Sequence, residues 1–168
     1  LDYPLLDRPT KDPGPRSEGF YSYPLDYETI LSQYDSEVQG NTVRGIRDDV
    51  AVIQLVDSKK RIAVYTACFP QDCYSDPKGG TKSTINHIFK KLKFANAKPL
   101  ALTNCLNFGN PENPEIMWEF TQTIEGMKDM CTSLDFPIVS GNVSFYNETN
   151  GDNIMPTPVF GAIGLMED

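Results

Sequence analysis

Histidine and cysteine are scarce in this chain of 168 residues, which has one histidine, His87, and four cysteines. A single histidine, expected inside a helix, gives no basis for a Ser-His-Asp or Cys-His catalytic arrangement, and we expect it to be a surface or packed helical residue. Cys68 and Cys73 are separated by four residues, which is not a usual zinc spacing. The scarcity argues against a structural zinc site and a disulfide framework, and favours buried, reduced thiols.

Long apolar runs, an excess of basic residues and the familiar phosphate-binding motifs are also missing. No run approaches the roughly 20 apolar residues of a membrane span, so we expect no membrane partner. The 23 acidic residues outnumber the 15 basic ones and give a net charge of -8, which argues against a nucleic-acid partner. Neither G-x-x-x-x-G-K-[ST] nor G-x-G-x-x-G occurs. A magnesium-bound nucleotide is still compatible with this charge, because the metal and backbone N–H groups offset the phosphates locally.

The sequence predicts one domain preceded by an irregular segment. The chain begins with Leu1 and not methionine, and we expect it to be a piece of a longer protein. Residues 1 to 26 are rich in proline, charge and tyrosine without periodicity, which predicts a linker or extended arm; residues 27 to 168 form the domain. Its expected elements are a short helix at 27 to 38, a turn at 40 and 41, a strand at 50 to 56 buried on both faces, a loop at 57 to 60, a strand at 61 to 66, an irregular stretch at 67 to 80, a helix capped by Thr81 or Ser83, and strands at 98 to 103, 137 to 145 and 159 to 166.

The clearest predicted element is a helix that begins at Asn113 and ends near Asp135. Asn113 is a good N-cap, and Pro114 suits the first helical position. Apolar residues then recur at steps of three and four, which predicts a stripe that faces the core. The stripe consists of Ile116, Phe120, Ile124, Met127, Cys131 and Leu134. Paired strands and two long helices favour an α/β or α+β fold, with helices on one face of a mixed sheet.

Three polar stretches contain residue types that build cores poorly and bind ions well. The first, residues 45 to 49, places Asp48 and Asp49 directly before an expected buried strand. Two adjacent carboxylates suit magnesium, which prefers oxygen ligands. Composition alone favours the alternative interpretation, a solvated turn.

The other two stretches lie where expected strands end. Residues 102 to 115 hold asparagines, a glycine and two prolines directly after a strand, where ligands commonly bind; an elaborate strand-to-helix connection is the alternative. In residues 140 to 151, Gly141 lets backbone approach a ligand closely. Asn142 offers a carbonyl oxygen to a metal, and Ser144 offers a hydroxyl to a phosphate or substrate. A polar hairpin is the alternative for this stretch.

These stretches resemble a known enzyme family. Residues 103 to 115 and 140 to 151 closely resemble signatures of the phosphoribosylformylglycinamidine synthase large-subunit family. The likeness covers the chain from about residue 30 to residue 168. Shorter matches occur at residues 33 to 35, 38 to 43 and 156 to 158, and at Tyr74 with Asp76 and Pro77.

The resemblance implies a fold and a reaction. Large subunits of the family have two similar halves, each with an N-terminal domain like that of aminoimidazole ribonucleotide synthetase, and this chain looks like that domain of the second half. Two such domains pair their sheets into a barrel-like core, with nucleotide sites along the interface. The implied activity is ATP-dependent C–N ligation in purine biosynthesis. ATP phosphorylates the amide oxygen of formylglycinamide ribonucleotide, and ammonia from glutamine then displaces phosphate to give the amidine.

The resemblance also implies cofactors and partners. The cofactor is Mg²⁺, and ATP is a substrate. The partners are the rest of the same chain, a glutaminase subunit and a small accessory subunit, or a second copy of this piece as a homodimer, in the cytoplasm. Asp48 and Asp49 resemble metal-binding aspartates of the wider superfamily, which includes thiamine-monophosphate kinase and selenophosphate synthetase.

Four further site residues follow from the resemblance, one position at a time. Asn104 stands where the family usually has an aspartate that contacts ATP, and Gly141 matches a glycine at the ATP. Asn142 matches a magnesium ligand. Ser144 matches a residue that contacts the substrate.

Departures from the family pattern leave two hypotheses. Ala67, Phe69 and Gln71 stand where the family more often has an aspartate, an asparagine and an arginine, and Asn104 lacks the usual negative charge, which weakens a metal-assisted contact. The metal-binding glutamate and catalytic histidine of the first half have no counterpart here, so we expect no catalytic residue in this chain and a general base outside it. The chain then either supplies nucleotide, metal and substrate contacts, or is a degenerate half that scaffolds the catalytic one. A stand-alone kinase is disfavoured, because both signature stretches match the synthase.

Overall fold

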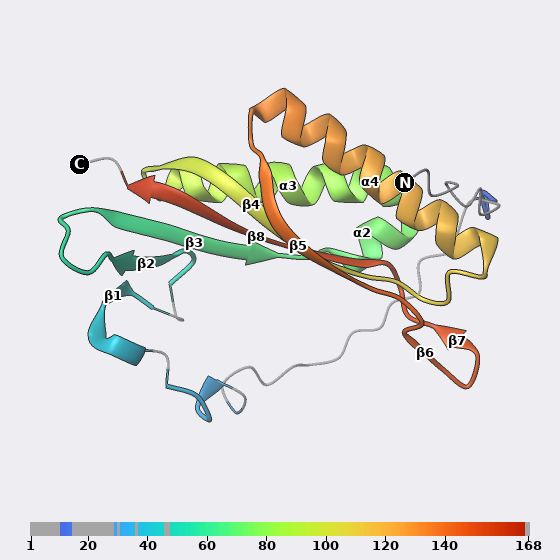
Figure 1. Ribbon diagram of the computed structural model, residues 1–168, viewed down its shortest axis with the longest axis horizontal. Coiled ribbons are helices and arrows are strands. Elements are labelled where there is room, and N and C mark those ends of the chain that lie inside the picture. Colours follow the sequence, from blue (N-terminus) through green and yellow to red (C-terminus); the bar gives the residue numbers. More distant parts are fainter. Residues whose placement is uncertain (1–10, 15–28, 30, 36, 46–47, 167–168) are drawn as a thin grey trace, which may run out of the picture.

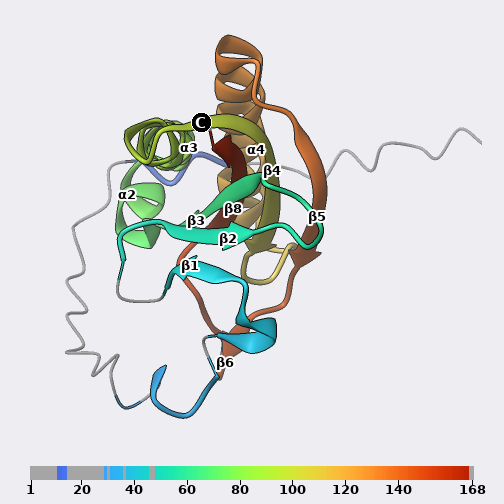
Figure 2. The same cartoon turned by 90° about the vertical axis from the view of Figure 1, so that its left-hand side faces the viewer.

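A mixed sheet with helices on one face makes up most of the chain. The computed structural model describes residues 11–14, 29, 31–35, 37–45 and 48–166. Six strands pair in the order β1-β2-β3-β8-β4-β5, and β6 and β7 form a separate two-stranded hairpin. The helices α2, α3 and α4 lie on the same side of the large sheet (Figures 1 and 2). The predicted mixed sheet with helices on one face is therefore confirmed.

The large sheet is mostly antiparallel, with one parallel pair of strands. All pairs of neighbouring strands in the large sheet are antiparallel except β4 and β5, which are parallel and connected by α4. The bounds are η1 Val38–Gly40, β1 Thr42–Arg44, β2 Ala51–Gln54, β3 Arg61–Ala67, α2 Pro70–Ser75, α3 Pro77–Phe94, β4 Ala97–Asn107, α4 Pro114–Leu134, β5 Ile138–Ser144, β6 Glu148–Thr149, β7 Asp152–Asn153 and β8 Thr157–Met166.

The predicted strand pair at 50 to 56 and 61 to 66 is present as the β2–β3 hairpin. Asp57 in its loop has a φ of 57°, a conformation that asparagine and aspartate tolerate better than most residues. The predicted burial on both faces is wrong: Val52 is 2% exposed, whereas its neighbours Ala51 and Ile53 are only half-buried. Helices cover only one face of the described sheet, so alternate residues of β2 face away from the core.

The predicted irregular stretch at 67 to 80 is helical instead. It contains α2 and the first turn of α3, and the N-cap of α3 is Asp76, not Thr81 or Ser83. The Asp76 side chain accepts a hydrogen bond from the Gly79 N–H at 2.9 Å, and Pro77 takes the first helical position. A Cβ on Gly80 would lie 2.5 Å from the backbone nitrogen of Cys73, so this glycine permits the close packing of α2 on α3.

Strand β4 is longer than predicted and includes part of the second polar stretch. It continues from Ala97 to Asn107, with Leu102 and Leu106 buried. Residues 103 to 107 are therefore strand, and only residues 108 to 113 connect it to α4. The pairing of β4 with both β8 and β5 explains the extension, because it satisfies the backbone of these polar residues from both sides.

The predicted helix at 113 to 135 is confirmed. Asn113 accepts a hydrogen bond from the Glu115 N–H at 2.9 Å, and Asp135 ends the helix in a left-handed conformation with φ 49°. One member of the predicted stripe is misplaced, since Ile124 is 36% exposed. Glu119, Thr123 and Gly126 are buried instead; a Cβ on Gly126 would lie 2.6 Å from the carbonyl oxygen of Lys78, so α4 packs closely on α3 along this line.

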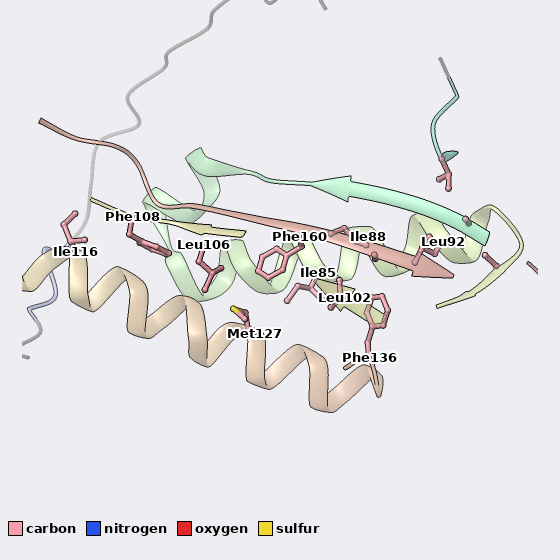
Figure 3. Packing of buried hydrophobic residues seen from close by; sticks show 14 residues of the cluster. Ile85, Ile88, Leu92, Leu102, Leu106, Phe108, Ile116, Met127, Phe136 and Phe160 are labelled. Atoms are coloured by element: carbon pink, nitrogen blue, oxygen red, sulfur yellow. The ribbon is translucent and has the colours of Figure 1, made fainter. Parts of the chain in front are cut away.

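The core lies between the sheet and the two long helices. Figure 3 shows apolar side chains from β4, β8, α3 and α4 meeting in this layer. Its largest fully buried members include Phe108, Phe136, Phe160, Ile85 and Leu102. No helix in the described part of the chain is long and apolar enough to cross a membrane.

Most of the N-terminal predictions fall on residues outside the described ones. Of the predicted linker at 1 to 26, residues 11–14 are described, and Lys11 donates its N–H to the carbonyl of Pro114 at 3.1 Å. Of the predicted helix at 27 to 38, the described residues show helix at Thr29 and Leu31, followed by a turn. The predicted turn at 40 and 41 is present, with φ 67° at Gly40.

Candidate functional site

The parallel pairing of β4 and β5 brings the two signature stretches side by side. In this register Asn104 lies opposite Gly141, Cys105 opposite Asn142, and Asn107 opposite Ser144. Four of the predicted site residues, far apart in sequence, therefore occupy one short section of two neighbouring strands. This section lies toward the carboxyl ends of both strands, where ligands of parallel strands commonly bind.

Strand alternation distributes these residues over both faces of the sheet. Asn104 is two residues from each of the core residues Leu102 and Leu106, and side chains two residues apart in a strand share a face. Asn104 and its partner Gly141 therefore lie on the face that carries the helices. Asn142 and Ser144 lie on the opposite face, which no helix of the described residues covers. A ligand that contacts all four must therefore reach around the exposed edge of β5.

Gly141 leaves the space that the Asn104 side chain occupies. A Cβ at this position would lie 2.8 Å from Cγ and 3.1 Å from Nδ2 of Asn104, and closer still to Oδ1. The Asn104 amide thus lies against bare β5 backbone. Glycine is required here for proximity, since Gly141 does not have a positive φ.

The Asn142 side chain keeps its carbonyl oxygen available. It is exposed, and its amide nitrogen Nδ2 makes a weak contact with the Cys105 sulfur at 4.0 Å. An exposed amide oxygen is a ligand type that magnesium accepts. On the same face, the Ser140 hydroxyl donates to the Thr103 hydroxyl at 2.8 Å.

A hollow of about 360 Å³ lies beside this hydroxyl pair on the open face of the sheet. Its walls come from β3, β4, β5 and β8 and are mostly apolar. They include Val64, Ala101, Thr103, Val139, Gly161 and Ile163. Val139 is 70% exposed and Ile163 is 40% exposed, so apolar surface of the sheet is open here.

Asparagine side chains fasten the loops that follow β4 and β5. Asn147 donates to the carbonyl of Phe108 at 2.9 Å, and Asn153 accepts from the Asn110 N–H at 2.6 Å. Backbone bonds add to these, with the Phe108 N–H donating to the Ser144 carbonyl at 3.0 Å. We predicted no role for these asparagines from the sequence, although several lie within the polar stretches.

Asp48 and Asp49 lie elsewhere, at the opposite edge of the sheet. They precede β2, and β3, β8 and β4 separate that strand from β5; four strand spacings correspond to roughly 19 Å. Asp49 receives two hydrogen bonds from Lys91 Nζ, at 2.7 and 2.8 Å, and Asp48 accepts from the Gly45 N–H at 2.9 Å. This chain alone therefore does not place these aspartates and Asn142 around one ion. In the described part of the chain, His, Cys, Asp and Glu form no group of three suited to a metal.

The ion pair with Lys91 changes the electrostatics of the aspartate stretch. The hydrogen bond to Asp49 raises the pKa of the Lys91 ammonium, so this lysine stays charged. The Lys91 ammonium group thus provides Asp49 with the positive charge that a bound metal would otherwise bring. A hollow of about 250 Å³ beside it is lined by Arg44, Asp48 and Asp49, among others.

His87 is a packed helical residue, as predicted, whereas of the four cysteines predicted to be buried only Cys73 is, and Cys68, Cys105 and Cys131 are half-buried. The His87 ring packs edge-on against Phe69 at 5.3 Å between centroids, and its Nε2 lies 3.1 Å from the Tyr65 hydroxyl. All four cysteines are free. Burial raises the pKa of the Cys73 thiol to about 12 and that of Cys68 to about 11, so both stay protonated and are poor nucleophiles.

Comparisons with known proteins agree on one family. The family model "AIR synthase related protein, N-terminal domain" matches residues 47–166. The phosphoribosylformylglycinamidine synthase subunit PurL of a Nitratiruptor species is 48% identical over 140 residues, which are 83% of this chain and 19% of that protein.

Solved structures give the same result. The PurLQS structure from Thermotoga maritima matches with a TM-score of 0.81 and 26% identity, over 96% of this chain and 27% of that chain. T. maritima PurL complexed with ATP matches with a TM-score of 0.74 and 25% identity, over 94% of this chain and 27% of that chain. The chain thus spans about a fifth to a quarter of the length of these relatives.

Proposed function

The chain belongs to the family of AIR synthase related proteins, as an N-terminal domain of the PurL type, and we propose that it works as part of a longer phosphoribosylformylglycinamidine synthase. In that enzyme ATP activates the amide oxygen of formylglycinamide ribonucleotide, and glutamine-derived ammonia displaces phosphate to form the amidine. The domain contributes contacts to nucleotide, magnesium and substrate. It is inactive alone.

One observation carries this proposal: the parallel register that sets Asn104 beside Gly141 and leaves the Asn142 amide oxygen exposed at the carboxyl ends of β4 and β5. The arrangement joins a close backbone approach with polar groups of the kinds that bind magnesium nucleotides. The ATP complex of T. maritima PurL, a structural relative over 94% of this chain, supports the assignment to a nucleotide-binding protein.

Each residue has a role that its chemistry permits. The Asn104 amide and the Gly141 backbone contact ATP, the Asn142 oxygen is a magnesium ligand, and the Ser144 hydroxyl contacts the ribonucleotide substrate. Magnesium, when bound with the triphosphate, offsets its negative charge. Because asparagine replaces the usual aspartate at position 104, the contact there is a neutral hydrogen bond, which is weaker than a charged one.

Asp48 and Asp49 are a separate candidate pair of metal ligands. Asp49 binds Lys91 with both carboxylate oxygens, so a metal there must first displace the ammonium group. The pair belongs to a second ion position, at the other edge of the sheet from Asn142.

The partners follow from the length of the relatives and from the open sheet face. The rest of the same chain supplies the general base. By likeness to the PurLQS assembly of T. maritima, a glutaminase subunit and a small accessory subunit complete the enzyme. The uncovered apolar face around Val139 and Ile163 pairs with the sheet of the companion domain to close a barrel-like core; a homodimer of this piece would use the same face.

A second candidate function, a scaffold for the catalytic half, has its own support. Ala67 and Phe69 lack the polar groups common in the family, and the Phe69 ring packs on His87, which fills that region with structural contacts. Lys91 likewise occupies Asp49. Under this alternative the β4–β5 edge would bind no nucleotide that turnover requires.

Turnover of the complete synthase with Asn142→Ala separates the two candidates. We expect amidine formation from formylglycinamide ribonucleotide, ATP and glutamine to fall at least about tenfold, the effect of losing one metal ligand or its partner, with loss of bound nucleotide. Thr149→Ala, on the exposed hairpin of β6 and β7, is the control and keeps full activity. If Asn142→Ala retains both activity and nucleotide content, the ligand-binding role of this edge is wrong.

A further inference from the structure

The side chain of Asn147 encloses the hydroxyl of Ser144. Asn147 Nδ2 lies 3.1 Å from Ser144 Oγ, and Ser144 Oγ lies 3.3 Å from Asn147 Oδ1. The two residues lie three positions apart, across a turn in which Tyr146 has a φ of 58°. Positive φ is uncommon for a residue with a bulky side chain, so this turn needs support from its surroundings.

The Asn147 oxygen Oδ1 determines which way the Ser144 hydroxyl points. Besides Ser144 Oγ, Asn147 Nδ2 reaches the carbonyl oxygens of Phe108 at 2.9 Å and of Ser144 at 3.1 Å. Both carbonyls also accept backbone hydrogen bonds, the Phe108 carbonyl from the Asn147 N–H at 3.3 Å and the Ser144 carbonyl from the Phe108 N–H at 3.0 Å, and together these bonds hold the Asn147 amide in place. Held there, Asn147 Oδ1 is the acceptor of the Ser144 hydroxyl, at 3.3 Å.

We infer that Asn147 is a positioning residue that makes Ser144 a hydrogen-bond acceptor toward the substrate. With its hydrogen held by Asn147, the Ser144 oxygen presents only lone pairs to the ligand. It therefore selects a group with an N–H or O–H donor, such as a ribose hydroxyl or an amide N–H. This inference rests on the proposed function, in which Ser144 contacts the ribonucleotide.

A purely structural role for Asn147 makes a different prediction, and the chain supplies a matched control. Asn153 also fastens the two loops, by accepting from the Asn110 N–H at 2.6 Å, and the structure shows no bond between it and Ser144 among the described residues. If Asn147 only fastens loops, its removal and that of Asn153 should have the same effect on kinetics. If Asn147 positions Ser144, Asn147→Ala should change the kinetics in the same way as Ser144→Ala, and Asn153→Ala should not.

A double-mutant cycle in the complete synthase tests this. Ser144→Ala, Asn147→Ala, the double variant and Asn153→Ala are compared by kcat and by KM for formylglycinamide ribonucleotide. We expect Ser144→Ala and Asn147→Ala each to raise KM about tenfold, as expected for one hydrogen bond, with a smaller change in kcat. The double variant should be no worse than either single variant, and Asn153→Ala should leave KM within about twofold.

The outcomes separate the inference from the function on which it rests. Multiplied effects in the double variant, or an equal KM increase in Asn153→Ala, overturn the positioning role while the substrate contact of Ser144 stands. An unchanged KM in Ser144→Ala overturns both. Should Asn147→Ala fail to fold, Asn147→Asp keeps the acceptor oxygen: KM should stay within about threefold of the parent, and a rise equal to that of Ser144→Ala refutes the inference.

Discussion

Replacing Gly141 by alanine tests the contact between the two signature stretches most selectively. The added Cβ would lie 2.8 Å from Cγ of Asn104, where ordinary contacts begin at 3.4 Å. Since Oδ1 of Asn104 would lie closer still, the Asn104 amide must move away by about an ångström or more. It is the end of a flexible side chain and only half-buried, so it can swing aside while the strands stay paired.

The expected magnitudes follow from these distances. Alanine in a strand is more stable than glycine by about 0.5–1 kcal/mol, which offsets the cost of moving one amide, so the unfolding free energy should change by less than about 1 kcal/mol. The nucleotide loses the displaced amide contact, worth about 1–1.5 kcal/mol. We therefore expect Kd for a magnesium-bound, non-hydrolysable ATP analogue to rise about tenfold.

Calorimetric titration of the complete synthase, together with thermal unfolding, measures both quantities. Gly45→Ala is a suitable control for the stability measurement, because a Cβ there has one ordinary contact, 3.6 Å from Cγ2 of Thr42. An unchanged Kd in Gly141→Ala would refute the assignment of ATP to this edge. A loss of more than about 2 kcal/mol in stability would refute the claim that the Asn104 amide swings aside.

Three further predictions concern packing, charge and reactivity. Gly126→Ala should lower the unfolding free energy in urea by about 1–2 kcal/mol, since its Cβ would lie 2.6 Å from the Lys78 carbonyl and overpacking exceeds the gain in helix propensity; unchanged stability would contradict the tight α3–α4 contact. Lys91→Met should free Asp49 from its ion pair and strengthen Mn²⁺ binding in paramagnetic titrations, and no gain would show that Asp49 is not a metal ligand even when unpaired. Cys73, whose pKa burial raises to about 12, should resist iodoacetamide at pH 8 until the protein is unfolded; rapid labelling of the native protein would contradict its burial.

Local signals in the sequence were sufficient for several elements. Asn113 and Pro114 predicted the start of α4 because N-capping is a matter of a few neighbouring groups. The polar loop at 57 to 60 between two apolar runs predicted the β2–β3 hairpin for the same reason. Such features depend little on the rest of the fold.

Other features depended on contacts between distant segments and were missed. Residues 103 to 107 are polar, and only the pairing of β4 with both β5 and β8 makes them strand. Ile124 fits a helical stripe, but Gly126 brings α3 so close that the contact line shifts to Glu119 and Thr123. The prolines and glycines of residues 67 to 80 concealed α2 and the first turn of α3, because the reason for Gly80 is tertiary, namely close packing on Cys73.

The sequence predicted which residues belong to the candidate site, but not how they are arranged in space. The sequence stretches identified Asn104, Gly141, Asn142 and Ser144, and the parallel register places them together. The sequence did not show that these residues lie on two different faces of the sheet. Their faces depend on the β4–β5 register, which has an irregularity between Leu102 and Thr103. The distance of Asp49 from this edge follows from the strand order, and its ion pair with Lys91 follows from the packing of α3 beside it; no local pattern specified either.

A structure of the complete synthase with magnesium and a non-hydrolysable ATP analogue tests the central claim most directly. We predict a magnesium ion about 2.1 Å from the Asn142 amide oxygen, with the nucleotide against the Gly141 backbone and the Asn104 amide. A nucleotide bound elsewhere, with these three residues open to bulk water at the edge of β5, would contradict the account.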